Sequence, residues 1–156
     1  MSSLCATVSQ LDNNQLLAGL KTLVQQDRKN LVDLLVHLGE VDQRKLHLRA
    51  AKPSLFAYCR DELRMSEPTA SKRIGAARLA RRYPILLDLI GTGDLHLSGL
   101  SVLSPYLTDG NHRELLDAAA SQWSVGAVAA TIAAILLLGG AVGKSAQLPL
   151  QTWLPD

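Results

Sequence analysis

Aromatic residues are scarce in this sequence, because Phe, Trp and Tyr together make up 4% of its 156 residues. A core with so few aromatic rings must consist mainly of Leu, Val, Ile and Ala, which suits packed helices better than sheets. The two cysteines, Cys5 and Cys59, are too few for a disulfide framework, and free thiols fit a reducing cytosol. The N-terminus has neither a basic nor an apolar segment, so we expect no signal peptide.

Charge is absent from one long stretch near the C-terminus. Residues 124–143, SVGAVAATIAAILLLGGAVG, contain no Asp, Glu, Lys or Arg. All but Lys144 of the 16 basic residues and all but Asp156 of the 14 acids lie within residues 1–122. A composition break this sharp predicts a domain boundary. We therefore expect a soluble helical domain over residues 1–122 and an apolar, membrane-spanning or domain-packed tail over residues 123–156.

Apolar residues recur every three or four positions from Leu16 to Leu38, and no segment shows sustained alternation. This pattern predicts a long N-terminal amphipathic helix that begins at Asp12 or Asn13, extends to about Leu48 and buries its stripe in the core. Shorter helices are expected over 54–64 (with Pro53 in the first turn), 66–83, 85–90, 98–103 and 112–121, with a turn over 91–94. The fold class is predicted to be all-α, with six or seven helices in the soluble domain and an apolar C-terminal helix.

One predicted helix concentrates positive charge, since residues 72–82 hold five basic residues and no acid: Lys72, Arg73, Arg78, Arg81 and Arg82. Such a helix can lie along a phosphate backbone, and with the preceding helix it has a helix-turn-helix character. The sequence therefore suggests DNA as a partner of these five residues. The alternative is a solvated face whose arginines pair with the nearby acids Asp61, Glu62 and Glu67.

Three segments resemble the helical N-terminal domain that precedes the nuclease module in a group of bacterial HNH endonucleases. They are HLGEVDQRKLHLRA (37–50), SLFAYCRDELRMSEPTASKRIGAARLARRYP (54–84) and GDLHLSGLSVLSPYLTDGNHRELLDAA (93–119). The resemblance covers about residues 12–121, with a departure at Ala51 and Lys52. The metal-binding His-Asn-His module of that family is not found in this sequence, so we expect no nuclease activity, no catalytic residue and no cofactor.

The tail carries a different resemblance, in AILLLGGAVGKSAQLPLQTWLPD (134–156). This segment is similar to a transmembrane segment of the antiporter-like L subunit of NADH-quinone oxidoreductase (respiratory complex I). The resemblance implies that Lys144 occupies the place of an intramembrane lysine on the proton-translocation path. Two unrelated resemblances in one chain indicate a chimera or a truncated product, whether natural, an assembly artefact or designed.

Other motifs favour ordinary structural roles. The GKS at 143–145 lacks the glycine that a phosphate-binding loop needs five residues before the Gly-Lys pair, because Leu138 stands there. The four histidines are far apart and show no metal-ligand spacing, so no metal site is expected. Glu40, Asp42 and Arg44 are typical of a structural ion-pair network on a long helix rather than of a catalytic carboxylate pair.

These observations leave two functions open. The first is a non-catalytic helical accessory domain of an HNH-endonuclease-like protein, with DNA as its partner. The alternative is a truncated fragment of a proton-translocating NADH-quinone oxidoreductase membrane subunit, or a chimeric product without a selected function. We expect a cytoplasmic protein, with membrane association through residues 124–143 as the remaining possibility, since about 18 apolar residues span roughly 27 Å of a bilayer core that is about 30 Å thick.

Overall fold

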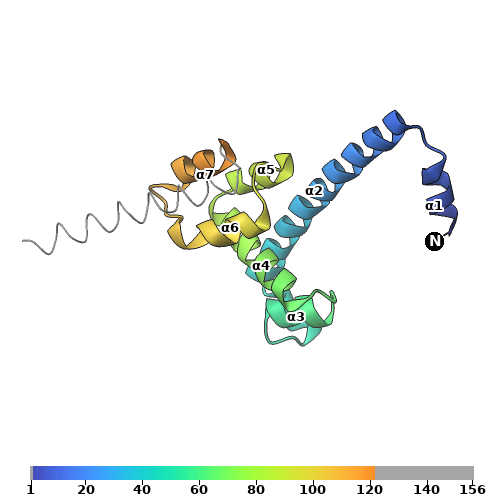
Figure 1. Cartoon of the computed structure of the whole chain (residues 1–156). Helices are drawn as coiled ribbons and strands as arrows, with labels where there is room; N and C mark the ends of the chain where they lie inside the picture. The colour runs from blue at the N-terminus through green and yellow to red at the C-terminus, as the bar shows by residue number, and fades with distance from the viewer. Residues whose placement is uncertain (1, 122–156) are drawn as a thin grey trace, which may run out of the picture. The chain divides into compact units, whose positions relative to one another are not determined.

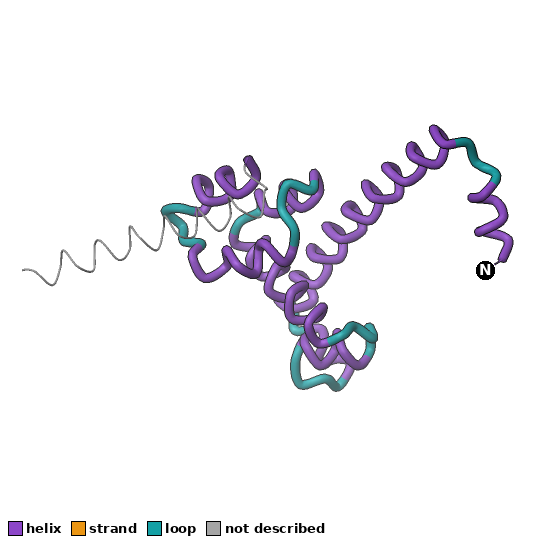
Figure 2. The backbone as a smooth tube through the Cα atoms, viewed as in Figure 1, coloured by secondary structure: helices purple, strands orange, loops and turns teal. Residues whose placement is uncertain are grey.

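The computed structural model describes residues 2–121, and all of their regular structure is helical, which confirms the all-α prediction (Figures 1 and 2). The chain divides into two compact units, Met1–His112 and Arg113–Asp156. The domain boundary that composition predicts after residue 122 stays a prediction. In the part of the chain that the structure describes, no helix is both long enough and apolar enough to cross a bilayer.

The long amphipathic helix exists as α2, Asn13–Gln43, and follows a short helix α1, Ser2–Ser9. Of the two residues expected at its start, Asp12 is the N-cap, because the Asp12 carboxylate accepts a hydrogen bond from the Gln15 N–H at 2.8 Å. The Gln15 side chain accepts one from the Asp12 N–H in return, which completes a capping box. The predicted extension to Leu48 is wrong, since Lys45 takes a left-handed conformation (φ 51°) that ends the helix.

The chain then folds back through η1, Leu46–Ala50, and α3, Leu55–Asp61, whose N-cap is Ser54. Pro53 was expected in the first turn of α3 but precedes the cap, because the Ser54 hydroxyl accepts the hydrogen bond of the Ala57 N–H. Helix α4, Glu67–Arg82, begins as predicted after Ser66, with Pro68 in its first turn. Proline is compatible with that turn because its missing N–H would have no partner within the helix.

Four short elements follow: α5 Ile85–Thr92, α6 Leu97–Leu103, η2 Ser104–Tyr106 and α7 His112–Ser121. The turn expected over 91–94 begins later, because α5 continues through Gly91 and Thr92. Gly93 then closes the helix in a left-handed conformation (φ 90°), which glycine adopts without a steric penalty.

The core of the first unit lies where α4 meets α2, α3 and α6, and where α5 packs on α2 (Figure 1). It is built from aliphatic side chains as the scarcity of aromatics predicts, with Leu35, Leu86 and Leu100 each at most 1% exposed. The expectation that the whole stripe 16–38 faces this core is wrong. Only the C-terminal half of α2 is covered, whereas Leu16, Leu17, Leu20, Leu23 and Val24 are 43–69% exposed.

Candidate functional site: the basic helix α4 and its surroundings

Helix α4 buries one face and exposes its cations. Ala70, Ile74, Ala77 and Ala80 recur at three- and four-residue steps and are all buried. This spacing places them on one side of the helix, so the basic residues are carried on the other sides. Lys72, Arg78, Arg81 and Arg82 are exposed, and Arg73 is half-buried.

Two of the arginines bind the C-terminal turn of α2. The Arg78 guanidinium donates to both carboxylate oxygens of Asp42, at 2.7 and 3.3 Å. Arg81 donates to the Gly39 carbonyl at 3.2 Å and to the Glu40 carboxylate at 3.1 Å, and it also contacts the Gln43 side-chain oxygen. These bonds tie residues about 40 positions apart in the sequence and hold α4 against α2.

The acids in this contact are held in their charged form. Hydrogen bonds from Arg44 and Arg81 lower the pKa of Glu40, and the hydrogen bonds from Arg78 lower the pKa of Asp42. Arg44 pairs with Glu40 one helical turn away. The interpretation of Glu40, Asp42 and Arg44 as part of a structural ion-pair network therefore agrees with the geometry, and the network extends to α4.

The third arginine, Arg82, belongs to a separate cluster at the end of α4. It forms a two-bond pair with Asp109, at 3.0 and 2.8 Å, and the buried Tyr83 donates its hydroxyl to the same carboxylate at 3.0 Å. The His112 ring stacks on Tyr83 with 4.6 Å between ring centroids. Arg82 and Tyr83 lower the pKa of Asp109, whereas burial raises the pKa of the Tyr83 hydroxyl.

The alternative prediction for these arginines placed their partners on the preceding segment, at Asp61, Glu62 and Glu67. That assignment is wrong for Arg78, Arg81 and Arg82. Asp61 and Glu62 bind Lys52, and Asp61 and Glu67 bind Arg60. The real partners lie on α2 and in the loop before α7.

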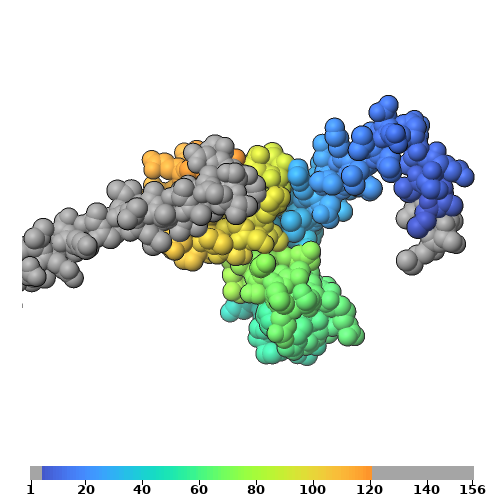
Figure 3. Space-filling model, in the orientation of Figure 1, coloured from blue at the N-terminus to red at the C-terminus, as the bar shows by residue number. Residues whose placement is uncertain are grey.

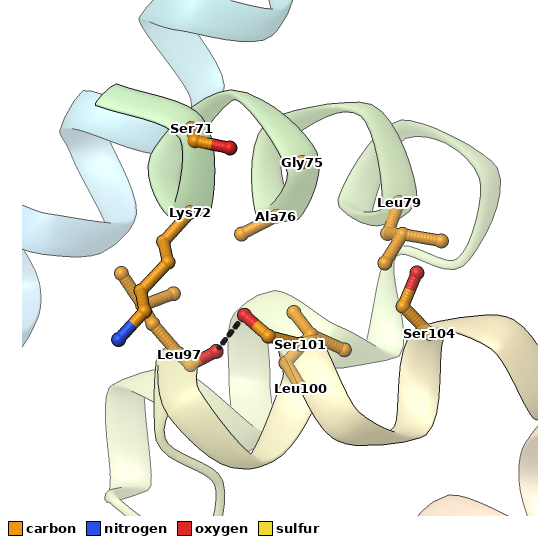
Figure 4. Close-up of a pocket in the computed structure, with 9 residues that line it drawn as sticks. All are labelled: Ser71, Lys72, Gly75, Ala76, Leu79, Leu97, Leu100, Ser101 and Ser104. Carbon is orange, nitrogen blue, oxygen red and sulfur yellow. Dashed lines mark hydrogen bonds between the residues drawn. The ribbon is translucent and has the colours of Figure 1, made fainter. Parts of the chain in front are cut away.

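Lys72 and Arg73 differ from the other three cations because neither forms an ion pair with an acid within residues 2–121. The Lys72 ammonium lies 3.3 Å from the Ser98 hydroxyl, and the Arg73 guanidinium contacts the Met65 sulfur at 3.8 Å. Lys72 borders a groove of about 300 Å³ between α4 and α6 (Figure 4). Gly75 also lines the groove, and a Cβ added there would meet no atom within 4 Å.

The groove combines one cation, Lys72, with serine hydroxyls. Three serines line it, Ser71, Ser101 and Ser104, but none of its lining residues is a His or a carboxylate that could act as a base. The Ser101 hydroxyl donates to the Leu97 carbonyl at 2.8 Å (Figure 4). Over the described residues, no three His, Cys, Asp or Glu side chains gather as a metal site requires. The groove can therefore bind a polar or anionic group through the Lys72 ammonium and the serine hydroxyls.

The other predicted site residue, Lys144, and the uncharged run 124–143 lie outside the described residues. The predicted roles of Lys72, Arg73, Arg78, Arg81 and Arg82 in DNA contact stay a prediction. The structure pairs three of the five with carboxylates, which reduces the net positive charge that a nucleic acid would meet there.

Comparison with known proteins identifies a family, which the geometry of the site does not. A family model described as "NADH:quinone oxidoreductase/Mrp antiporter, TM" matches residues 76–156, just over half of the chain. The chain is 49% identical over 65 residues to NADH-quinone oxidoreductase subunit L of Pseudomonas aeruginosa and 48% identical over 65 residues to subunit L of Escherichia coli K12. Each alignment covers 41% of this chain but 11% of the relative, so the chain spans only a small part of those proteins. No solved structure matches it.

These findings support the second of the two functions drawn from the sequence. They agree with the resemblance of residues 134–156 to an antiporter-like subunit and extend it toward the N-terminus, into α4. The expectation of a cytoplasmic protein is wrong, because the matching family is one of transmembrane proteins. The resemblance of residues 12–121 to an HNH-endonuclease domain gains no support from them and stays a prediction.

Proposed function

We propose that this chain, which belongs to the NADH:quinone oxidoreductase/Mrp antiporter family, is a piece of a proton-translocating membrane subunit of NADH-quinone oxidoreductase type. The observation that carries the proposal is the family match over residues 76–156, together with 48–49% identity to two subunits L. Because the chain spans only 11% of those subunits, the activity of the whole subunit would require segments that this sequence does not contain.

The composition of the matched region supports a place in the bilayer. The run 124–143 carries no charge, and burying it in lipid removes a large apolar surface from water. A lysine directly after the run keeps its charge at modest cost if its ammonium reaches the interface or a polar cavity of the subunit.

Lys144 is the residue that we assign to proton movement within this piece. A lysine in a low-dielectric site has its charged form disfavoured, so small changes in nearby charge can load and unload its proton. Lys144 alone cannot move protons across a membrane, since a path needs further ionisable groups on neighbouring helices. The other helices of the subunit would have to supply them.

A fractionation experiment tests the location. The full chain, with a C-terminal tag, is expressed in bacteria, and the membranes are washed with alkaline carbonate, which removes peripheral proteins. We expect the chain to stay in the washed membranes and to leave them when Leu137 is changed to Glu in the middle of the run. Release of the unaltered chain by carbonate would contradict the proposal.

A segment exchange tests the function. The 65 residues of E. coli subunit L that align with this chain are replaced by the matching segment, and NADH-driven proton uptake into inverted vesicles is measured. We expect the exchange to retain proton uptake and Lys144→Ala in the exchanged segment to abolish it, while Lys144→Arg retains a part. Equal uptake by the exchanged subunit with and without Lys144→Ala would remove Lys144 from the proton path.

A second, separate function concerns a part of α4 that lies before the match. Lys72 and Arg73 are the cations of α4 without a carboxylate partner in the described residues, which makes them the two that remain available for a phosphate group. This restricts the predicted contact with DNA to the first half of α4. Retention of the full chain on immobilised duplex DNA at low salt should fall with Lys72→Ala and Arg73→Ala together, and should change little with Arg78→Ala, whose guanidinium is already paired.

A further inference from the structure

The groove that Lys72 borders runs between α4 and α6, which lie against each other (green and yellow in Figure 3). The α4 residues that line it recur at three- and four-residue steps, which places them on one side of the helix. They are Ser71, Lys72, Gly75, Ala76 and Leu79. A Cβ added at Gly75 would meet no atom within 4 Å, so there is free space beside the middle of this run.

One end of the groove is cationic. Among the described residues that line it, Lys72 carries the only charge, and none is a carboxylate. The Lys72 ammonium donates to the Ser98 hydroxyl at 3.3 Å and forms no ion pair within residues 2–121. An ammonium has three N–H donors, so two remain for a ligand. The Ser71 hydroxyl lies at the same end (Figure 4), so an anion here would meet donors and no repelling charge.

Away from Lys72 the lining becomes apolar, from Ala76 and Leu100 to Leu79 at the opposite end (Figure 4). The seven steps from Lys72 to Leu79 correspond to about 10 Å along the helix axis. Between the two ends, the Ser101 hydroxyl already donates to a backbone carbonyl, so it offers a ligand only its lone pairs. A ligand that fits both ends has an anionic head and an apolar body.

We propose that this groove binds a phosphate monoester with a short apolar body. The phosphate accepts hydrogen bonds from the Lys72 ammonium and the Ser71 hydroxyl, and the body lies over Ala76 and Leu100 toward Leu79. A phosphate monoester carries a charge of about −1.5 to −2 near pH 7 and has three acceptor oxygens, so it can use several donors at once. The groove volume of about 300 Å³ is at the small end for ligand sites, so the ligand is small.

This inference does not rest on the DNA contact proposed for Lys72 and Arg73. A nucleic acid held at Lys72 would leave the apolar part of the groove in water, whereas a small ester buries its body there. Arg73 does not line the groove, because its guanidinium contacts the Met65 sulfur at 3.8 Å. A change at Arg73 therefore separates the two proposals, since it would reduce retention on DNA without affecting the groove.

Methyl NMR of the full chain in a mild non-ionic detergent tests the site, with butyl phosphate as the probe. We expect saturable shifts of the Ala76 and Leu100 methyl signals and none of the signal of the exposed Leu20, which reports nonspecific uptake. Inorganic phosphate should bind about 10-fold more weakly, because it has no apolar body to bury. Butanol should give no saturable shift, because it has no charge.

Two pairs of variants locate the ligand. Lys72→Gln removes the charge and should weaken binding of butyl phosphate about 10-fold, whereas Arg73→Gln, at the next residue, should leave it unchanged. Gly75→Leu fills the free space with a side chain that favours helix, and it should abolish the saturable shifts. Gly19→Leu is its matched control, because a Cβ at Gly19 also meets no atom within 4 Å and Gly19 lies on α2, outside the groove.

Three results would overturn the proposal. Absence of saturable shifts with butyl phosphate would show that the groove takes no phosphate ester. Equal affinity for inorganic phosphate and butyl phosphate would show that the apolar lining takes no part. Unchanged binding by Gly75→Leu, in a chain whose circular dichroism shows unaltered helicity, would place the ligand elsewhere. If Gly75→Leu did not fold, unchanged binding by Lys72→Gln, at an exposed side chain, would refute the site in the same way.

Discussion

Substituting Gly39 is the sharpest test of how closely α2 and α4 approach. Gly39 is buried on α2, and a Cβ added there would lie 3.1 Å from Cδ and 3.2 Å from Cγ of Arg81, and 3.5 Å from the Ala77 carbonyl oxygen. The first two distances are shorter than an ordinary carbon–carbon contact of about 3.5–4.0 Å. Gly39→Ala can therefore be accommodated only if the Arg81 side chain moves by a few tenths of an ångström.

Two opposing effects set the size of the change. Replacing glycine by alanine inside a helix stabilises it by about 0.5–1 kcal/mol when the site has room. Moving Arg81 weakens its hydrogen bonds to the Gly39 carbonyl and to the exposed Glu40 carboxylate, which opposes that gain. We expect the two to cancel, so that Gly39→Ala changes the free energy of unfolding by less than about 0.5 kcal/mol or destabilises slightly. Gly39→Val should destabilise by about 1–3 kcal/mol through overpacking.

Gly75→Ala is the matched control. Gly75 lies in the interior of α4, and nothing comes within 4 Å of a Cβ added there. Gly75→Ala should therefore raise the free energy of unfolding by about 0.5–1 kcal/mol, the full gain from replacing glycine with alanine inside a helix. The assay is urea unfolding of the full chain in mild detergent, followed by circular dichroism at 222 nm. If Gly39→Ala stabilised the protein as much as Gly75→Ala, then α2 and α4 would not approach each other as the structure has it.

Three further outcomes are expected. Leu86 is fully buried, so Leu86→Ala should cost about 2–5 kcal/mol of unfolding free energy by urea titration, and a loss under 1 kcal/mol would contradict its place in the core. Hydrogen bonds from Arg82 and Tyr83 lower the pKa of Asp109. The contribution of the Asp109 carboxylate to the free energy of unfolding is therefore complete above the ordinary carboxyl pKa of about 3.9, and it is lost as the pH falls through the lowered pKa of Asp109. Asp109→Asn should therefore flatten the loss of thermal stability below about pH 4, and an unchanged acid limb would show that the pair is not formed. Burial raises the pKa of the Cys59 thiol, so iodoacetamide should modify the exposed Cys5 before Cys59 in the native chain. Mass spectrometry of the peptides measures the two rates of modification, and equal rates would mean that α3 opens readily.

Several features could be read from the sequence because they depend on neighbours within a few residues. The start of α2 was predicted at Asp12 or Asn13, and the structure places the N-cap at Asp12. The start of α4 follows from Ser66 and Pro68. The end of α2 was missed, because nothing local announces that Lys45 adopts a left-handed conformation. Non-glycine residues enter that region only where the surrounding fold holds them there.

In the candidate site, too, local features were predictable from the sequence and distant contacts were not. Composition correctly placed five cations on one helix, yet it chose the wrong acids for Arg78, Arg81 and Arg82. Proximity in sequence favoured Asp61, Glu62 and Glu67, while the fold brought acids from about 27–41 positions away. Ion pairs form at short range in space, and helix packing decides which distant side chains come within that range.

The sequence by itself determined that the described part of this chain is helical, where α2 and α4 begin, and that an uncharged segment akin to a transmembrane family follows. These properties depend on periodicity, capping and composition, which act over a few residues. Only the tertiary structure decided that Arg78, Arg81 and Arg82 are paired with carboxylates, and that the stripe from Leu16 to Val24 is left uncovered. A 3.6-residue period states that a helix has an apolar face, but what covers that face depends on where the rest of the chain packs.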